Sequence, residues 1–446
     1  MKPKKPDNHP DLFRSQLSQI INMSHPLVHM AEKINWQRLE DSIDTVYSTG
    51  SGQPPLPTRL LVGLHYLKYT FDESDESVVA RWVENPYWQF FCGFEYLQHK
   101  VPLHPTSLIK WRNRVGDKLE SLLAETIKVA TENKIIKATE TKHVNVDSTV
   151  QEKNITFPTD AKLYQRAREL LVKEAEKQGI CLRQSYKRVG KKAFIMQGRY
   201  SHARQMKRSA KQTRKLKTYL GRVIRDIRRK CQVPSESLLS LLDRAESIHK
   251  QQRGDKNKIY SVHEESVYCI SKGKIHKKYE FGNKVSIVSS SKSNWILSSI
   301  SLENEYDGHT LEQALEQTIK LTNKKPQHVY CDMGYRGHQL NHKGYGKIHL
   351  VGKIPKSFTK TARKWMKRRA AVEPIIGHVK SDHRMKRNYL KGENGNQNNV
   401  ILAASAYNFR KLLKWFYCAL SKLFKNSENA LKNMIDCQYS DWILQG

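Results

Sequence analysis

The chain has 446 residues, of which 38% are hydrophobic and 27% charged, and its formal net charge is +35 at pH 7. This length allows two or three domains with sizeable cores. No apolar run approaches the roughly 18 residues that a membrane-spanning helix needs. The basic start at residues 1–6 leads into polar residues, unlike a secretory signal. We therefore expect a soluble protein that does not associate with membranes.

The seven cysteines are scattered, odd in number and never spaced as Cys-x-x-Cys. This pattern argues against a disulfide framework or a structural zinc site and indicates a reducing compartment. We expect the cytoplasm, with the protein associated with the nucleoid.

The first 125 residues are predicted to be helical. Residues 1–52 form a helical arm that ends in a turn-rich linker, and residues 53–125 form an all-α domain. A helix near its end, at 107–115, carries Lys110, Arg112 and Arg114. A basic helix that follows two others is typical of a helix-turn-helix-like DNA-binding domain. A plain helical packing domain explains the same pattern, so both interpretations stand.

Strand-like segments begin near residue 140. They lie at 143–150, 267–270, 284–288, 295–300 and 328–332, with helices at 310–322 and 400–423. This order predicts an α/β catalytic domain with a mixed sheet over residues 140–425, followed by a tail at 426–446. A basic helical insertion at about 160–258 separates the first strand from the others, and such loops are tolerated because closure entropy grows slowly with length.

The insertion carries a dense block of positive charge. Residues 182–230 contain 18 Lys and Arg residues but only one acidic residue, Asp226. Clustered like charge is unfavourable unless a polyanion neutralises it, and such a stripe usually contacts a phosphate backbone. We therefore expect this block to bind nucleic acid through residues such as Arg225, Arg228 and Arg229. The alternatives are a solvated helix face or a disordered tail.

Three acidic residues suit a single site. Asp147 and Asp332 end short apolar runs of strand type, and Glu373 opens a helix or lies within one. Carboxylates at strand ends and on a helix can converge on divalent cations, because a hard Mg²⁺ ion prefers oxygen ligands. We expect these residues to be both catalytic and metal-binding, although a single Asp at a strand end is often only a turn former.

The surroundings of Glu373 strengthen this hypothesis. Arg369 precedes it by four residues and Lys380 follows it by seven, so both share its face on an uninterrupted helix. The carboxylate would then hold metal while the two cations contact phosphates. Pro374 also permits a helix that begins at that residue, which leaves the placement of Arg369 open.

The acidic trio with Arg369-x3-Glu373-x6-Lys380 resembles the DDE transposases of bacterial insertion sequences, in the group marked Tyr-x2-Arg-x3-Glu-x6-Lys. Met366 stands where that group has tyrosine, with Trp365 beside it. Other similar stretches lie at 56–61, 85–89, 279–284, 306–311 and 332–337. The similarity covers about residues 25–415 and is greatest to the insertion-sequence-five branch.

This resemblance implies an RNase H-like catalytic core with two Mg²⁺ or Mn²⁺ ions in the active site. It also implies double-stranded DNA as partner, both the terminal inverted repeats of a mobile element and the target, and a homodimer or higher oligomer on that DNA. Paired cations activate water or a DNA 3′-hydroxyl and stabilise the leaving oxygen. Near the metals, His309 and Arg336 are further candidates for DNA contact.

Other functions account for part of the pattern. A metal-dependent nuclease without strand transfer needs the same carboxylates. A domesticated DNA-binding regulator is expected to have lost at least one acid of the trio, whereas all three are present. An RNA-binding protein explains the charge but not the trio, and the chain lacks the interleaved aromatics of common RNA modules.

Overall fold

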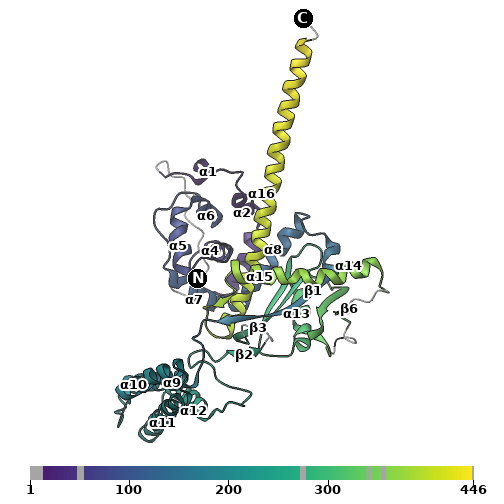
Figure 1. The fold of residues 1–446 in the computed structure, drawn as a ribbon. Helices are drawn as coiled ribbons and strands as arrows, with labels where there is room; N and C mark the ends of the chain where they lie inside the picture. The colour runs from purple at the N-terminus through teal and green to yellow at the C-terminus, as the bar shows by residue number, and fades with distance from the viewer. Residues whose placement is uncertain are drawn as a thin grey trace. The chain divides into compact units, whose positions relative to one another are not determined.

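The structure is a computed structural model that describes residues 14–47, 55–271, 278–338, 340, 344–352 and 358–443. The chain divides into two compact units (Figure 1). The first comprises residues 1–151 and 284–446, and the second comprises residues 152–283.

The first unit begins with a set of helices. They are α1 (Leu17–Ile20), α2 (Pro26–Lys33), α3 (Trp36–Ile43), α4 (Thr58–Thr70), α5 (Asp75–Glu84), α6 (Pro86–Phe91), α7 (Pro105–Val115) and α8 (Glu120–Glu132), with 3-10 turns η1 (Asp44–Val46), η2 (Gly116–Leu119) and η3 (Ala138–Lys142). Five of them begin after a residue whose side chain accepts a backbone N–H of the first turn: His25, Asn35, Ser74, Asn85 and His104. Such caps satisfy donors that the helix itself leaves unpaired.

These helices share one hydrophobic core with the rest of the first unit. Tyr66 of α4 stacks on Phe409 of α16 (Gly392–Ile443) with ring centroids 5.0 Å apart, and its hydroxyl donates to the Leu122 carbonyl at 2.7 Å. The sequence predicts a separate all-α domain at 53–125. Because its apolar side chains are buried against α16, the structure does not divide this segment from the catalytic core.

A mixed sheet forms the centre of the first unit. Its strands are β1 (His143–Lys153), β3 (Tyr279–Ser290), β4 (Ile296–Leu302), β5 (His328–Asp332), β6 (Lys347–Val351) and β7 (Arg387–Asn388). The order is β3-β1-β5-β6, with β4 beside β3 and β7 beside β1. β5 is parallel to both β1 and β6, whereas β3 and β4 are antiparallel.

The remaining helices of this unit surround the sheet. They are α13 (Asp307–Thr322), η4 (Met333–Tyr335), α14 (Lys360–Arg368), η5 (Arg369–Ala371), α15 (Val372–Asp382) and α16. α13 and α16 pack against β4, while η5 lies against β5. The predicted boundary at residue 425 falls inside α16, whose backbone continues as one helix to Ile443.

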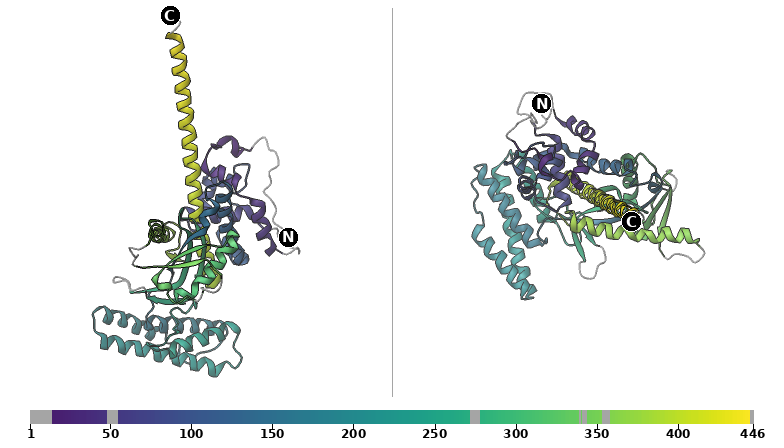
Figure 2. Two further views of the ribbon diagram at one scale, coloured as in Figure 1. Left: turned by 90° about the vertical axis from the view of Figure 1, so that its right-hand side faces the viewer. Right: turned by 90° about the horizontal axis from the view of Figure 1, so that it is seen from above.

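The second unit is a helical bundle joined to a short hairpin. It contains α9 (Asp160–Lys177), α10 (Lys187–His202), α11 (Met206–Lys230), α12 (Glu236–Lys250), and β2 (Tyr268–Ser271), which pairs antiparallel with the first residues of β3. Figure 2 shows the four helices side by side. Their apolar stripes form a separate core that includes Leu171, Leu220 and Leu242.

The second unit is wider than the insertion predicted at about 160–258. It also contains the ends of β1 and β3, and a buried ion pair joins Lys153 to Glu264 at 3.0 Å. The sequence prediction missed these strand residues because it was based on helical periodicity, which does not extend to them. In the described part of the chain, no helix is both long and apolar enough to cross a membrane.

One face of the sheet carries stacked rings from β1, β5 and β6. His143 stacks on His328, with centroids 4.6 Å apart, and Tyr330 stacks on His349 at 4.9 Å. Trp365 of α14 covers His143 at 4.1 Å and nearly parallel. The rings therefore fix α14 against the sheet.

We predict that the two hydrophobic cores respond separately to mutation. Leu220→Ala should lower the free energy of unfolding of the second unit by about 2–5 kcal/mol, because it leaves a cavity in a fully buried position. Val233→Ala is the control, since Val233 is 89% exposed. Calorimetry of the full chain should show one transition shifted by Leu220→Ala, and an unchanged profile would contradict the separate core.

The stacked histidines predict a pH dependence of stability. Burial, and then the positive charges of His328 and Lys347, lower the pKa of His349 to about 4. As the pH falls, His349 is therefore protonated in the unfolded chain before it is protonated in the folded chain. Neutral His349 costs the folded state no stability above about pH 6.5, and the free energy of unfolding decreases as the pH falls from there towards 4. His349→Phe should lose less stability than the wild type over this window in urea unfolding, with the exposed His99→Phe as control. Parallel curves for wild type and His349→Phe would refute the assignment.

Candidate active site

Strand register brings two of the acidic residues together. Parallel strands β1 and β5 pair Asn145 with Tyr330, and two residues further along each strand lie Asp147 and Asp332. Side chains alternate between the faces of a strand, so both carboxylates project from the face that carries Asn145 and Tyr330. The buried Val144 and Val146 occupy the opposite face of β1.

Arg369 joins all three acidic residues. One terminal nitrogen of its guanidinium, Nη2, lies 2.9 Å from Asp147 Oδ2 and 3.5 Å from Asp332 Oδ2, and the other, Nη1, lies 3.4 Å from Glu373 Oε1. The exposed fraction rises from 14% for the Asp147 side chain to 39% for Asp332 and 65% for Glu373. The trio therefore forms one site that opens to solvent on the side of Glu373.

The helix that carries Glu373 begins before its proline. α15 starts at Val372, so Pro374 lies in the first turn, where its missing N–H costs no hydrogen bond. The 3-10 turn η5 connects α14 to α15 and carries Arg369. The spacing of four residues thus brings Arg369 to Glu373 although the helix is not uninterrupted.

Backbone amides hold the two aspartates. Asp147 Oδ1 accepts the N–H of Ser148 at 2.8 Å, and Asp332 Oδ1 accepts the N–H of Gly334 at 2.9 Å. A methyl group at Gly334 would lie 3.0 Å from Asp332 Oδ1 and 3.4 Å from Asp307 Oδ2. A side chain at position 334 would therefore require the Asp332 carboxylate to shift by a few tenths of an ångström.

The donor set fits a hard divalent cation. Three carboxylates face one guanidinium, which leaves negative charge in excess, and carboxylate oxygens are the ligands that Mg²⁺ prefers. Arg369 lies between the three acids. With it there, no three His, Cys, Asp or Glu side chains of the described residues stand close enough to share a single ion.

Two contacts that the sequence did not indicate position Arg369. The amide of buried Asn145 donates to the Arg368 carbonyl at 2.9 Å and accepts the Ser291 hydroxyl at 2.6 Å. Trp365 stacks on His143 one turn earlier. Alternation along β1 places His143, Asn145 and Asp147 on one face, and this signal could have identified Asn145 from the sequence.

A fourth carboxylate lies beside the trio. Asp307 pairs with Lys284, with 3.1 Å between Oδ1 and Nζ, and Lys284 also donates to the Glu305 carbonyl at 2.5 Å. Both residues fall in stretches whose similarity to a family was noted above, but neither was assigned to the site. Their proximity depends on the packing of strand β3 and helix α13, which strand β4 separates in the sequence.

The other predicted DNA contacts of the first unit lie in different settings. His309 is exposed in the first turn of α13, and Arg336 is exposed after η4. Lys380 lies two turns after Glu373 on α15. Lys110 and Arg114 are exposed on α7, whereas Arg112 of the same helix is buried. Since Arg112 is 1% exposed, it cannot contact a duplex laid along the surface of α7.

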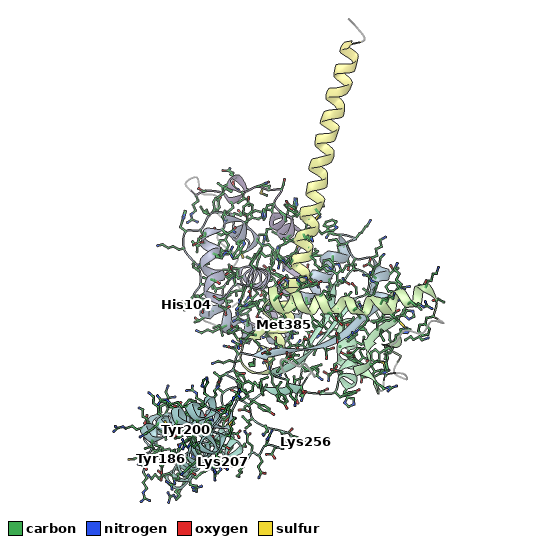
Figure 3. All side chains as sticks on the ribbon, in the orientation of Figure 1. His104, Tyr186, Tyr200, Lys207, Lys256 and Met385 are labelled. Carbon is green, nitrogen blue, oxygen red and sulfur yellow. The ribbon has the colours of Figure 1, made fainter. Side chains whose placement is uncertain are left out.

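The predicted contacts of the second unit belong to α11. Arg225 is exposed, Arg228 pairs with Asp243 and Glu246 of α12, and Arg229 pairs with Asp226. α10 and α11 together carry one acidic residue, whereas α9 and α12 carry the others of the bundle. Figure 3 labels Tyr186, Tyr200 and Lys207 next to and on these basic helices. The bundle therefore has a basic side formed by α10 and α11.

Comparison with known proteins gives two family matches. The family described as "Transposase domain (DUF772)" matches residues 15–114, and the family described as "Transposase DDE domain" matches residues 248–409. The chain is also 47% identical over 207 residues to "Uncharacterized protein ORF8 in nfe locus" of Rhizobium meliloti, which covers 46% of this chain and 100% of that protein. No solved structure matches the chain.

The second match covers the segment that supplies Asp332, Arg369 and Glu373, while Asp147 precedes it. The first covers the helices that pack on α16. Together with the resemblance in the sequence, these matches confirm the family: the chain belongs to the DDE transposases.

Proposed function

We propose that this transposase cleaves DNA at the ends of a mobile element and joins them to target DNA, with Asp147, Asp332 and Glu373 as the catalytic residues. The observation that carries this proposal is the contact of all three carboxylates with one guanidinium, Arg369. Residues 147, 332 and 373 lie far apart in the sequence, and the fold brings their side chains to one guanidinium. Carboxylates gathered around a positive charge could exchange that charge for a divalent cation.

Asp147, Asp332 and Glu373 are proposed as the residues that would hold two Mg²⁺ or Mn²⁺ ions. When bound, such ions lower the pKa of the attacking water or hydroxyl and stabilise the leaving oxygen of a phosphodiester. The N–H groups of Ser148 and Gly334 orient one oxygen of each aspartate and leave the other, Oδ2, directed at Arg369. Lys380 and the displaced Arg369 would contact phosphate oxygens.

The sheet supports an RNase H-like core. Strands in the order β4-β3-β1-β5-β6 combine an antiparallel pair with parallel strands, and the two aspartates end up on adjacent parallel strands. The helical bundle enters between β1 and β2, after the first catalytic Asp. This arrangement fits the insertion-sequence-five branch.

Charge supports double-stranded DNA as partner. The net charge of +35 and the basic side of α10 and α11 suit a phosphate backbone, whose counterions are released on binding. Arg225 is proposed as a contact there, and Lys110, Arg114, His309 and Arg336 in the first unit. Transposition brings two element ends together, and the resemblance to the DDE transposases implies the homodimer or higher oligomer on DNA that we propose.

Asp147→Asn should abolish strand cleavage and leave binding to element ends intact, because the amide keeps the shape of the side chain and loses its charge. The assay is cleavage of a labelled element end with Mg²⁺, together with a gel-shift measurement. The exposed Asp117→Asn is the control and should cleave normally. Full cleavage by Asp147→Asn would refute the catalytic assignment, and an assay for joined products separates a transposase from a nuclease.

Arg369→Gln should lower the free energy of unfolding of the metal-free protein by about 1–3 kcal/mol, since the three carboxylates lose their counter-charge. Millimolar Mg²⁺ should then raise the Tm of this variant more than that of the wild type, in which the ion competes with Arg369. Lys364→Gln, at an exposed position of the preceding helix, is the control. Equal Mg²⁺ responses in wild type and Arg369→Gln would show that Arg369 does not occupy the place of the metal.

A further inference from the structure

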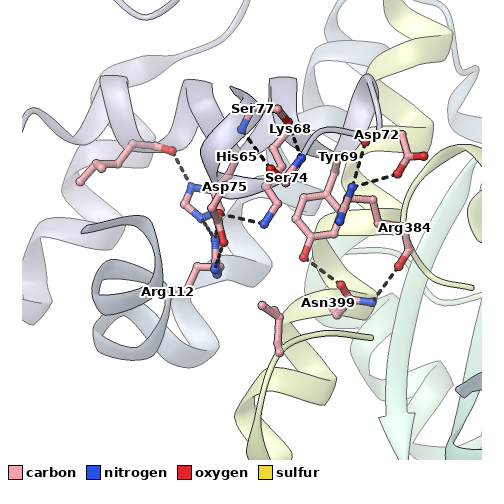
Figure 4. A network of polar contacts seen from close by, with 12 residues as sticks. His65, Lys68, Tyr69, Asp72, Ser74, Asp75, Ser77, Arg112, Arg384 and Asn399 are labelled. Atoms are coloured by element: carbon pink, nitrogen blue, oxygen red, sulfur yellow. Dashed lines mark hydrogen bonds and ion pairs between the residues drawn. The ribbon is translucent and has the colours of Figure 1, made fainter. Parts of the chain in front are cut away.

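A second cluster of charged residues lies in the first unit, built from α4, α5 and α7 (Figure 4). Arg112 makes two parallel hydrogen bonds of 2.7 Å to the two oxygens of Asp75, and Lys68 reaches Asp75 Oδ1 at 2.8 Å. The side chains of Lys68 and Arg112 are 5% and 2% exposed. The proposed chemistry uses neither of them.

The charges of this cluster do not balance. Two buried cations share the single carboxylate of Asp75, and the adjacent His65 cannot add negative charge. His65 Nε2 lies 3.2 Å from Arg112, and its Nδ1 lies 2.7 Å from the Leu61 carbonyl, which suits a neutral ring that accepts from the arginine. Burial, and then the charge of Arg112, lower the pKa of His65 to about 3. The cluster therefore keeps an excess of positive charge below the surface.

The excess of positive charge favours the neutral form of Lys68 and the charged form of Asp75. Burial, and then the charge of Arg112, lower the pKa of Lys68 to about 8, although Asp75 acts against both. For Asp75 burial acts to raise the pKa, but hydrogen bonds from Arg112 and the charge of Lys68 hold it well below its usual range. A buried cation without a full counter-charge is costly, and an anion beside Lys68 would remove that cost.

A cavity of about 660 Å³ opens directly onto the cluster. Besides Lys68, Asp75 and Arg112, its wall includes Arg384, Lys391 and Asn398 from the segment between α15 and α16 and from α16 itself. Arg384 pairs with the exposed Asp72, which lies outside the wall, at 3.1 Å. The carboxylates of the wall are Asp75 and Glu76. Cations thus outnumber carboxylates around the cavity.

We propose that this cavity binds a phosphate group, and specifically a phosphate of a DNA strand. Its donors are a lysine ammonium, arginine guanidinium groups and a side-chain amide, which together match an anion with several acceptor oxygens. A chain of net charge +35 that belongs to the transposases meets such groups on its DNA. Arg112 is too deeply buried to contact DNA on the surface of α7, but it can contact a phosphate inside this cavity.

Calorimetric titration of the full chain tests the proposal without any cleavage. The probes are inorganic phosphate and a 5′-phosphorylated trinucleotide, compared in chloride buffer of equal ionic strength. Lys68→Met and Arg384→Gln should each weaken phosphate binding by about tenfold or more, which corresponds to about 1.4 kcal/mol. Lys118→Gln, exposed on η2 and outside the cavity, is the matched control and should bind as the wild type does.

Arg384 is less buried than Lys68, so Arg384→Gln is the less disruptive substitution. It therefore still tests the cavity if Lys68→Met does not fold. Weakened binding of the trinucleotide in either variant supports the cavity with DNA as the source of the phosphate. Weakened binding of inorganic phosphate alone supports a site for free phosphate. Absence of binding, or binding that neither folded variant weakens, overturns the proposal. The titration measures binding without Mg²⁺ and without cleavage, so failure of the catalytic proposal would leave this result unaffected.

Discussion

The proposed active site depends on the contact of three carboxylates with one guanidinium. Arg369 lies between Asp147, Asp332 and Glu373 and offsets part of the repulsion between their like charges. The surrounding secondary structure positions the residues that make this contact. Parallel strands β1 and β5 align the aspartates, and η5 brings Arg369 over the face of the sheet from which they project.

The site is rigid on the side of the sheet and open on the side of α15. Asn145 and Trp365 attach the helix before Arg369 to β1, and backbone N–H groups hold one oxygen of each aspartate. Glu373 remains mostly exposed. If the trio binds metal as proposed, the two aspartates are preorganised as ligands, and the exposed Glu373 can adjust its position.

Much of this could be predicted from sequence, because the signals are local. Short apolar runs located Asp147 and Asp332 on strands, and the spacing of Arg369 and Glu373 indicated their contact. Asp332 does end β5, but the expected strand end at Asp147 was wrong, because β1 continues through polar residues to Lys153. Strand β6 was missed, since its alternation of Ile348 and Leu350 with polar residues is only five residues long. The burial of Arg112 was also missed, because its partner Asp75 lies 37 residues earlier and only tertiary packing joins them. Arg228 looked free in the sequence for the same reason, although it pairs with α12.

The most direct measurement is an anomalous difference map from crystals of the protein soaked in Mn²⁺. The account predicts peaks within coordination distance of Asp147 and Asp332, with the guanidinium of Arg369 moved away from both. An ordered site that shows no peak at saturating Mn²⁺, with Arg369 still between the carboxylates, would contradict it.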